Sequence, residues 1–220
     1  TVTATNSVGT GAASAASDTV TPELVPSVTS PTGKIWMDRN LGATRVATSW
    51  TDTASYGDLY QWGRGTDGHQ IRTSGTTTVR SSTHAPGNAY FIIGRSDWLN
   101  PRNDNLWQGV NGVNNPCPSG YRIPTETELN AERLSWSTND AAGAFASPLK
   151  LTTGGLRTDF DGSMYFASAG RYSGLYWSST VNTAYYNSHY LWFSEVDAFT
   201  FGGRNGAPRA TGGSVRCLKD

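Results

Sequence analysis

The hydrophobic and polar positions of the chain follow one clear helical pattern. Thr125 and Glu128 form an S/T-x-x-E capping box directly before the apolar positions Leu129 and Leu134. In such a box, the two side chains accept hydrogen bonds from the free N–H groups at the start of a helix. We therefore expect a helix over about residues 126–136, with the two leucines on its buried face.

After this helix, the pattern changes to short runs that alternate between apolar and polar residues and are separated by glycine-rich turns. The runs that we expect to form strands are PLKLTTGGLR, FDGSMYFASAG, GLYWSST, SHYLWFSEV, AFTFGG and GSVRCLKD. The dipeptide Asp161-Gly162 has the composition of a hairpin turn. One good helix followed by many short strands predicts an α+β fold with an antiparallel sheet.

The middle of the chain, before the helix, contains fewer periodic segments. KIWMDRNLGA predicts a strand that leads into a turn at Gly42, and TASYGDLYQWGR predicts a short helical or turn segment. Residues 64–88 and the stretch NPRNDNLWQGVNGVNNPCPSG are polar and rich in small residues, which is typical of long surface loops. Within the second loop region we expect Trp98, Leu106 and Trp107 to reach into the core.

The chain divides into three parts by composition. Residues 1–21 alternate Thr and Val with small residues around a glycine-containing turn, which predicts either a terminal hairpin or a disordered lead. This part resembles the end of a bacterial fibronectin type III or immunoglobulin-like repeat, so we interpret the chain as a piece of a longer protein. Three prolines mark residues 22–32 as a linker, and residues 33–220 are expected to form the main domain.

The charge of the chain is balanced, with 17 Lys and Arg against 17 Asp and Glu. Nucleic-acid binding needs a concentrated positive field, and a membrane span needs about 18 or more consecutive apolar residues. We therefore expect no nucleic-acid partner and no direct membrane insertion, and no signal peptide is visible. The two cysteines, Cys117 and Cys217, would form either a disulfide or two buried thiols, and the extracellular character of the sequence favours the disulfide.

Few residues offer catalytic or metal-binding chemistry. The three histidines, His69, His84 and His189, are widely spaced and are expected in surface loops. Glu128 and Glu132 lie one turn apart and are expected on the solvated face of the helix rather than in a catalytic pair. Neither a serine-nucleophile motif nor a calcium loop is present. We therefore predict no enzyme activity and no cofactor.

The stretch AYYNSHYLWFSEVDAFTFGG contains seven aromatic residues in twenty, whereas the whole chain is 11% aromatic. In a strand over residues 188–196, Leu191 and Phe193 share one face, and Tyr190, Trp192 and Ser194 share the other. We expect the first face to point into the core. The second face is either covered by another element or a binding surface. Its mixture of aromatic rings with Ser, Gly and Asn is typical of binding surfaces and favours the second alternative.

Six segments resemble, in order, the blocks of a known domain family. They are IWMDRNLGA, YGDLYQWGR, NPCPSGYRIPTETELN, LKLTTGGLR, GLYWSST and SVRCLKD. Together they resemble the "major paralogous" (FISUMP) domain, a C-type-lectin-like module of surface and secreted bacterial proteins, over about residues 33–220. The resemblance implies a compact α+β domain with short antiparallel sheets, one or two helices, long loops and termini that lie close together.

The end of the chain is also similar to the variable region of proteins that are diversified by retroelements, in which adenine-directed mutagenesis rewrites Asn-type codons. Most residue types in the aromatic stretch are reachable from an Asn codon in this way, whereas Trp and Glu need another template codon. The resemblance implies a fixed scaffold around a variable ligand-binding set, which comprises Tyr185, Tyr186, His189, Tyr190, Trp192, Ser194, Glu195, Asp197, Phe199, Phe201, Arg204 and Thr211.

These features predict a ligand-binding protein whose surface over about residues 184–213 recognises a macromolecule, either a protein or a glycan, on another cell or surface. We expect an extracellular location, on a cell surface or a virion. The alternative is a calcium-independent carbohydrate-binding module, because exposed Trp and Tyr rings also stack on sugars. An enzyme of the formylglycine-generating type, which shares the fold, ranks last because Cys117 and Cys217 flank scaffold blocks.

Overall fold

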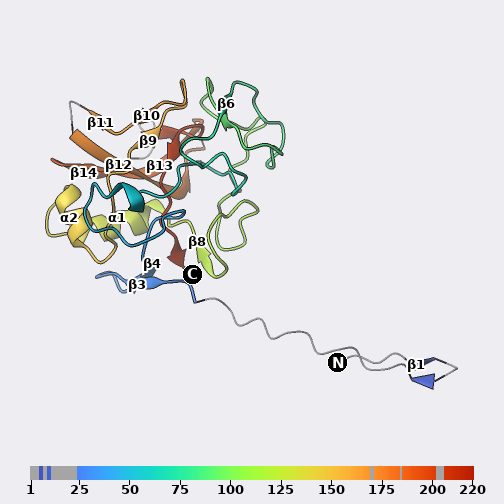
Figure 1. The fold of residues 1–220 in the computed structure, drawn as a ribbon, viewed down its shortest axis with the longest axis horizontal. Helices are drawn as coiled ribbons and strands as arrows, with labels where there is room; N and C mark the ends of the chain where they lie inside the picture. Colours follow the sequence, from blue (N-terminus) through green and yellow to red (C-terminus); the bar gives the residue numbers. More distant parts are fainter. Residues whose placement is uncertain (1–4, 7–8, 11–23, 169–170, 184, 202–205) are drawn as a thin grey trace.

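The protein is an α+β structure built from small, mostly antiparallel sheets and two helices (Figure 1). The computed structural model describes residues 5–6, 9–10, 24–168, 171–183, 185–201 and 206–220. The prediction of an α+β class with short antiparallel sheets is confirmed. Helices contribute little to the fold, because α1 has 9 residues and α2 has 6.

The central sheet contains the longest strands and carries the aromatic stretch. Its strand order is β11–β12–β13–β14, and the short strand β15 also pairs with β13. These five strands span Ala167–Ser168, Arg171–Val181, Asn187–Ser194, Ala198–Phe201 and Ala207–Pro208. Every pairing in this sheet is antiparallel.

A second sheet joins the two ends of the main domain. Its order is β3–β4–β17–β8, and its strands span Ser27–Thr29, Ile35–Met37, Leu218–Lys219 and Tyr121–Arg122. Because β17 pairs with β4, the last residues of the chain lie beside the first strands of the domain (Figure 1). The strand β3 lies inside the predicted linker at residues 22–32, so the domain begins before Gly33.

A third sheet has the order β10–β9–β16–β5, with strands at Met164–Tyr165, Leu156–Arg157, Gly212–Gly213 and Tyr60–Gln61. The hairpin between β9 and β10 contains the expected turn at Asp161-Gly162, where Gly162 has a φ of +74°. Two smaller pairs complete the strands: β1 at Thr5–Asn6 with β2 at Gly9–Thr10, and the parallel pair β6 at Thr76–Thr77 with β7 at Phe91–Ile92.

The helix α1 spans Glu126–Leu134 and begins with the predicted capping box. Glu128 N donates to Thr125 Oγ1 at 3.3 Å, and Thr125 N donates to Glu128 Oε2 at 2.8 Å. The buried face differs from the prediction, because Leu134 is 67% exposed and Glu132 is fully buried. At about 100° per residue, Leu134 lies about 140° around the helix from the buried Leu129, whereas Glu132 lies only about 60° from it.

The burial of Glu132 places a carboxyl group in the core, and this burial raises the pKa of Glu132.

The second helix, α2, spans Ala141–Ala146, and its N-cap residue is Asp140, whose side chain accepts a hydrogen bond from Gly143 N at 2.9 Å. A single 3-10 turn at Thr53–Ser55 precedes β5.

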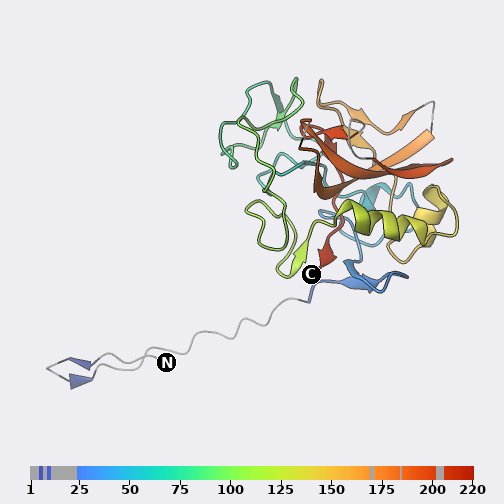
Figure 2. The same ribbon diagram turned by 180° about the vertical axis from the view of Figure 1, so that it is seen from behind.

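The core lies on both sides of the central sheet. One cluster includes Tyr176, Leu191 and Phe193 together with residues of α1 and α2, and Figure 2 shows α1 along this face of the sheet. The other cluster includes Leu175 and Trp177, which alternate with Tyr176 along β12. The sheet is therefore sandwiched between the helices and the loop-rich half of the domain.

The long loops before α1 are anchored by large buried side chains, as the sequence predicted. Trp98, Leu106 and Trp107 are each at most 1% exposed, and Trp98 Nε1 donates to Trp62 O at 2.7 Å. The prediction that all three histidines lie in surface loops is wrong for His69, which is fully buried within the first of these loop regions, and for His189, which lies in strand β13. A loop that buries its own polar side chains adds to the core instead of only surrounding it.

Within the described part of the chain, no helix combines the length and the apolar character that crossing a membrane requires. Nor do the described residues bring three or more His, Cys, Asp or Glu side chains together in the way that a metal site requires.

Candidate ligand-binding surface

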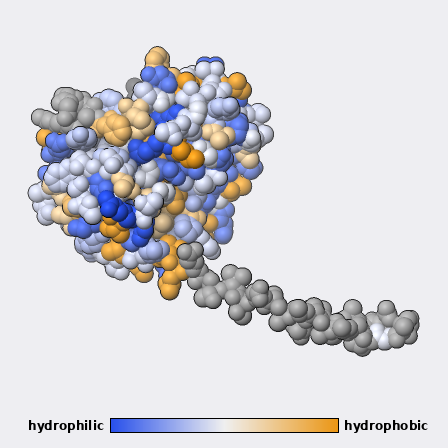
Figure 3. All heavy atoms as spheres, in the orientation of Figure 1, coloured by the Kyte–Doolittle hydropathy of each residue, from blue (hydrophilic) through white to orange (hydrophobic). Residues whose placement is uncertain are grey.

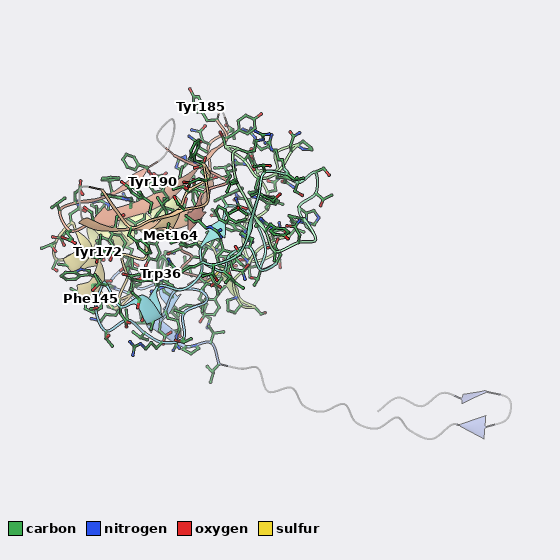
Figure 4. The ribbon with its side chains drawn as sticks, turned by 45° about the horizontal axis from the view of Figure 1, so that its top comes forward. Trp36, Phe145, Met164, Tyr172, Tyr185 and Tyr190 are labelled. Carbon is green, nitrogen blue, oxygen red and sulfur yellow. A yellow bond between two sulfur atoms is a disulfide. The ribbon has the colours of Figure 1, made fainter. Side chains whose placement is uncertain are left out.

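The alternation of β13 assigns its side chains to two faces. Leu191 and Phe193 are fully buried, as predicted, and pack toward the helices. Tyr190 and Trp192 point to the opposite face, where both are partly buried against the second core cluster. Figure 4 shows Tyr190 on the central sheet and Tyr185 farther out, at the margin of the domain. Of these four side chains in β13, only Tyr190 and Trp192 on the second face therefore remain partly accessible to solvent.

Four rings form a continuous row on this face, which we call the aromatic row: Tyr190, Trp192, Phe199 and Phe201. Cross-strand pairing places Trp192 opposite Phe199 and Tyr190 opposite Phe201. The ring centroids of Trp192 and Phe199 lie 4.8 Å apart in a stacked arrangement, those of Phe199 and Phe201 lie 4.0 Å apart, and those of Tyr190 and Phe201 lie 5.4 Å apart. Such neighbouring rings stabilise one another beyond their shared burial.

The row is supported from the next strand, which is itself fixed by hydrogen bonds. Trp177 lies opposite Tyr190, with ring centroids 6.3 Å apart, and Trp177 Nε1 donates to Tyr60 O at 2.8 Å. Trp62 Nε1 donates to Ser178 O at 2.8 Å. Burial also raises the pKa of Tyr190 to about 12. The row thus lies on a rigid base, and its inner members belong partly to the core.

Two tyrosines beyond the row are more exposed. Tyr185 is 38% exposed and Tyr186 is 52% exposed, in the connection between β12 and β13. This connection is held from below by Arg102, which donates to Thr183 O at 2.7 Å and to Tyr185 O at 3.2 Å. The guanidinium of Arg102 also lies 5.4 Å from the centre of the Tyr186 ring. Both tyrosines are therefore presented by a backbone that is tied to the rest of the domain.

Two acidic residues of the predicted set are exposed at the opposite end of β13. Glu195 accepts a hydrogen bond from Tyr172 N at 3.2 Å, and Asp197 accepts one from Ser194 Oγ at 2.8 Å. Both lie in the turn between β13 and β14. The accessible part of the predicted set consequently extends along the whole of β13, with tyrosines at one end, carboxylates at the other and the aromatic row between them.

Other members of the predicted set do not lie on this surface. Ser194 is 3% exposed because the turn to β14 closes over it, with Ser194 N donating to Asp197 O at 2.8 Å. Thr211 is 4% exposed and donates from Oγ1 to Asp159 Oδ1 at 3.1 Å. These two residues are corrections to the predicted surface.

His189 is a third correction, because alternation places it on the same face as Leu191, toward α1. Its Nδ1 lies 2.5 Å from Glu126 Oε2, and its side chain is 15% exposed. Arg204, the remaining member of the predicted set, lies outside the residues that the structure describes.

The scaffold beneath the surface is connected by a buried polar network. Arg216 is almost fully buried and donates from Nη2 to Asn40 Oδ1 at 2.8 Å and from Nη1 to Leu149 O at 2.5 Å. Asn40 Nδ2 in turn donates to Thr152 Oγ1 at 3.1 Å and to Tyr176 Oη at 3.0 Å. Burial lowers the pKa of Arg216 to about 10, which still leaves the guanidinium charged at neutral pH.

A disulfide ties the last scaffold block to the loop before α1. It joins Cys117 and Cys217, whose Cα atoms lie 5.8 Å apart and which are separated by 100 residues in sequence. The bond connects a loop at the start of β8 to the segment that enters β17, two neighbouring strands of the second sheet. The two cysteines therefore have a structural role in this fold.

Two features of the site were not predicted from the sequence. One is the support of the tyrosine-bearing connection by Arg102, which lies about eighty residues away in sequence. The other is an aromatic hollow of about 440 Å³ that is lined by Thr53, Tyr56, Arg72, Phe166 and Tyr172. The residues of this hollow come from segments that are distant in sequence, so no local pattern predicted that they lie together. The sequence showed only that Tyr56 and Tyr172 are aromatic residues in two separate segments.

Comparison with models of known protein families found no match, and searches against curated proteins and against solved structures found no match either.

Proposed function

We propose that this chain is a ligand-binding module with a C-type-lectin-like fold of the FISUMP kind, and that its variable surface recognises a macromolecular partner outside the cell. In this proposal, the recognition surface consists of Tyr185, Tyr186, the aromatic row, Glu195 and Asp197. Diversification by a retroelement would change the side chains of this surface while the scaffold stays constant.

The six segments that resemble the FISUMP family contact one another in the structure, and these contacts support the family proposal. Asn40, Thr152, Tyr176 and Arg216 come from four different blocks and share one buried hydrogen-bond network. Trp177 in GLYWSST donates to a backbone oxygen of YGDLYQWGR, and Trp62 in YGDLYQWGR donates to a backbone oxygen of GLYWSST. The disulfide joins NPCPSGYRIPTETELN to SVRCLKD. Blocks that resemble a family and also interlock in space are more specific than six separate matches.

The single observation that carries the binding proposal is the contrast between the two faces of β13. One face buries Leu191 and Phe193 against the helices, whereas the other presents a row of partly accessible rings flanked by two exposed tyrosines. Tyr and Trp supply large contact areas with few rotatable bonds, which is why they dominate binding hot spots. The exposed flanking positions can change without disturbing the interior.

A library experiment tests whether this surface is built to accept diverse side chains. Tyr185, Tyr186, Glu195 and Asp197 are randomised together, the variants are displayed, and binders to an arbitrary folded test protein are selected. We expect folded variants at most sequences and binders of micromolar affinity or better, because substitution of an exposed residue usually changes stability by about 0.5 kcal/mol or less. Loss of the Asp197 acceptor for Ser194 Oγ adds a cost of about 1 kcal/mol.

The control library randomises four exposed positions elsewhere, namely Val46, Val113, Leu134 and Phe160. Binders should arise from the first library and not from the control. Equal yields from both libraries, or a first library that mostly fails to fold, would contradict the proposal. A reverse transcriptase gene beside a near-copy of the 3′ end that differs at adenines would support the diversification step.

The aromatic hollow favours a second candidate function, calcium-independent carbohydrate binding. The rings of Phe166 and Tyr172 offer faces for stacking on a sugar, whereas Tyr56 forms the buried floor of the hollow, 5% exposed beneath Arg72 at 5.3 Å. Phe166 and Tyr172 are 36% and 45% exposed. Glycan binding that survives chelators and is lost in Tyr172→Ala would favour this candidate over the first.

A further inference from the structure

A hollow beside the exposed tyrosines has an unusual concentration of arginine. It has a volume of about 360 Å³ and is lined by Arg80, Gly94, Arg95, Ser96, Asp97 and Tyr186. Tyr186, which belongs to the proposed recognition surface, forms one wall, so the hollow is continuous with that surface. We call it the arginine hollow.

The charges around the arginine hollow do not balance. Asp97 is 2% exposed, accepts from Leu99 N at 3.0 Å and lies 3.8 Å from Arg209 Nη1. Arg209 also pairs with Asp104 at 2.7 Å, and Asp104 pairs with Arg102 at 3.3 Å. Asp97 Oδ2 is buried without a hydrogen-bond donor, and its carboxylate is attracted by Arg209, Arg80 and Arg102.

Arg80 and Arg95 are additional positive charges in the wall. Arg80 Nη2 donates to Leu99 O at 2.9 Å, and Arg95 Nη1 donates to Gly94 O at 3.0 Å. Among the described residues, neither arginine forms an ion pair with a carboxylate, and Arg80 Nε is buried without an acceptor. Buried or half-buried guanidinium groups usually pair with carboxylates, often in a bidentate manner. Of the two, Arg80 is half-buried and Arg95 is exposed, so only Arg80 is partly withdrawn from solvent without an ion pair. Counted with Arg102 and Arg209 against Asp97 and Asp104, the two arginines leave an excess of two positive charges around the hollow.

Two further hollows adjoin the arginine hollow, and we call the three together the groove. A second hollow of about 430 Å³ shares Arg80 with it and is also lined by Val79 and Tyr90. A third hollow of about 420 Å³ shares Tyr90 with the second and is also lined by Ile71. Val79, Tyr90 and Ile71 are 74%, 53% and 50% exposed. Figure 3 shows that apolar and polar residues are interspersed on the face of the domain it displays, so apolar groups are not gathered in one large patch there.

We infer that this groove binds an extended acidic segment of a protein partner, with a carboxylate between Arg80 and Arg95 and apolar side chains over Val79 and Ile71. The inference rests on the proposed function, because the groove begins at Tyr186. Aliphatic walls favour a peptide over a sugar chain, since aliphatic side chains gain more from apolar contact than hydroxyl-covered sugars do.

An NMR titration with short capped peptides tests the inference. The probe is a peptide of alternating Glu and Val, and the comparison ligands are the Lys-Val peptide and an oligogalacturonate of equal charge. We expect the Glu-Val peptide to shift the Nε–Hε signals of Arg80 and Arg95 but not that of Arg45, and the Lys-Val peptide to shift none of them. The double variant Arg80→Gln/Arg95→Gln should weaken binding of the Glu-Val peptide by about tenfold or more.

The matched control is Arg45→Gln/Lys219→Gln, which removes the same number of charges from exposed positions elsewhere. It should change the affinity by less than about twofold. Equal weakening in both double variants, an unshifted pair of arginine signals or tighter binding of the oligogalacturonate would overturn the inference. The peptide titration and the library selection use different residues, so their outcomes can be told apart. If the peptide does not bind but the library yields binders, the groove inference fails and the proposed function stands. If the peptide binds but the library yields no binders, the proposed function fails and only peptide binding in the groove stands.

Discussion

At the scale of single residues, buried polar groups are defined by the atoms around them. His69 Nε2 accepts a hydrogen bond from Gln61 N at 3.0 Å, and His69 Nδ1 lies 2.6 Å from Asp67 Oδ1. A backbone amide can only donate, so Nε2 carries no proton and the neutral ring donates from Nδ1 to Asp67. Burial lowers the pKa of His69 to about 4, because a charged ring would lose its solvation and place two donors against each other.

This arrangement predicts a stability that depends on pH. The unfolded chain binds a proton at His69 below about pH 6.5, whereas the folded chain does so only below about pH 4. The free energy of unfolding should therefore fall as the pH decreases from about 6.5 to about 4, by up to about 3 kcal/mol. Urea denaturation across this range and an NMR titration of the imidazole measure the effect.

His84 provides the control for this prediction because it is exposed. His84→Gln should keep the same dependence of stability on pH. A buried imidazole that titrates near its ordinary value of 6.5 would contradict the interpretation, as would a flat stability profile.

At the scale of elements, β13 and β14 act as one unit because their rings support each other. Phe199 contacts both Trp192 and Phe201, at 4.8 Å and 4.0 Å between ring centroids. The aromatic row is therefore both part of the proposed surface and part of the packing of the sheet. The sequence left open whether this face is covered or is a binding surface, and the structure shows that the members of the row are partly buried and partly accessible.

Replacement of Phe199 by Ala should consequently lower the free energy of unfolding by about 1–3 kcal/mol, because a partly buried ring and its two ring contacts are lost. Val196→Ala, in the adjacent turn at 56% exposure, should change it by less than about 0.5 kcal/mol. Thermal and urea denaturation of both variants test the difference. If both variants were as stable as the original protein, the row would be a surface feature only.

At the scale of the whole molecule, the domain is closed by contacts between its beginning and its end. The strand β17 pairs with β4 and β8, Arg216 reaches Asn40, and Cys217 is bonded to Cys117. Loops make up much of the first half, so closure of the chain into one unit depends on long-range links, to which the pairing of β16 with β5 also contributes. A rigid frame of this kind is what the proposed variable surface would need.

Removal of the disulfide should therefore destabilise the whole domain without changing its architecture. In the chain-entropy model, a closed loop of about 100 residues contributes about 4–5 kcal/mol by restricting the unfolded state. We expect the double variant Cys117→Ser/Cys217→Ser to have a free energy of unfolding that is lower by several kcal/mol, as measured by urea denaturation. Its far-UV circular dichroism spectrum should stay the same. A double variant with unchanged stability would show that the buried network alone closes the domain.

Local sequence patterns were sufficient wherever the outcome depends on neighbours in the chain. The capping box of α1, the inward position of Leu191 and Phe193, and the anchoring of Trp98 and Trp107 all follow from periodicity and residue type. The sequence also limited the cysteines to two states. These features concern the intrinsic geometry of helices and strands, which local sequence determines.

Only the tertiary structure decided which faces are covered and which charges are matched. Gly213 packs against Leu175 and Trp177, so part of the ring-bearing face is covered while the aromatic row stays partly accessible. Glu132 and His69 are buried by segments far from them in sequence, and the arginine hollow gathers residues from three separate loops. Burial and electrostatic pairing depend on contacts between residues that are far apart in sequence. Local sequence patterns do not predict the distances between such residues.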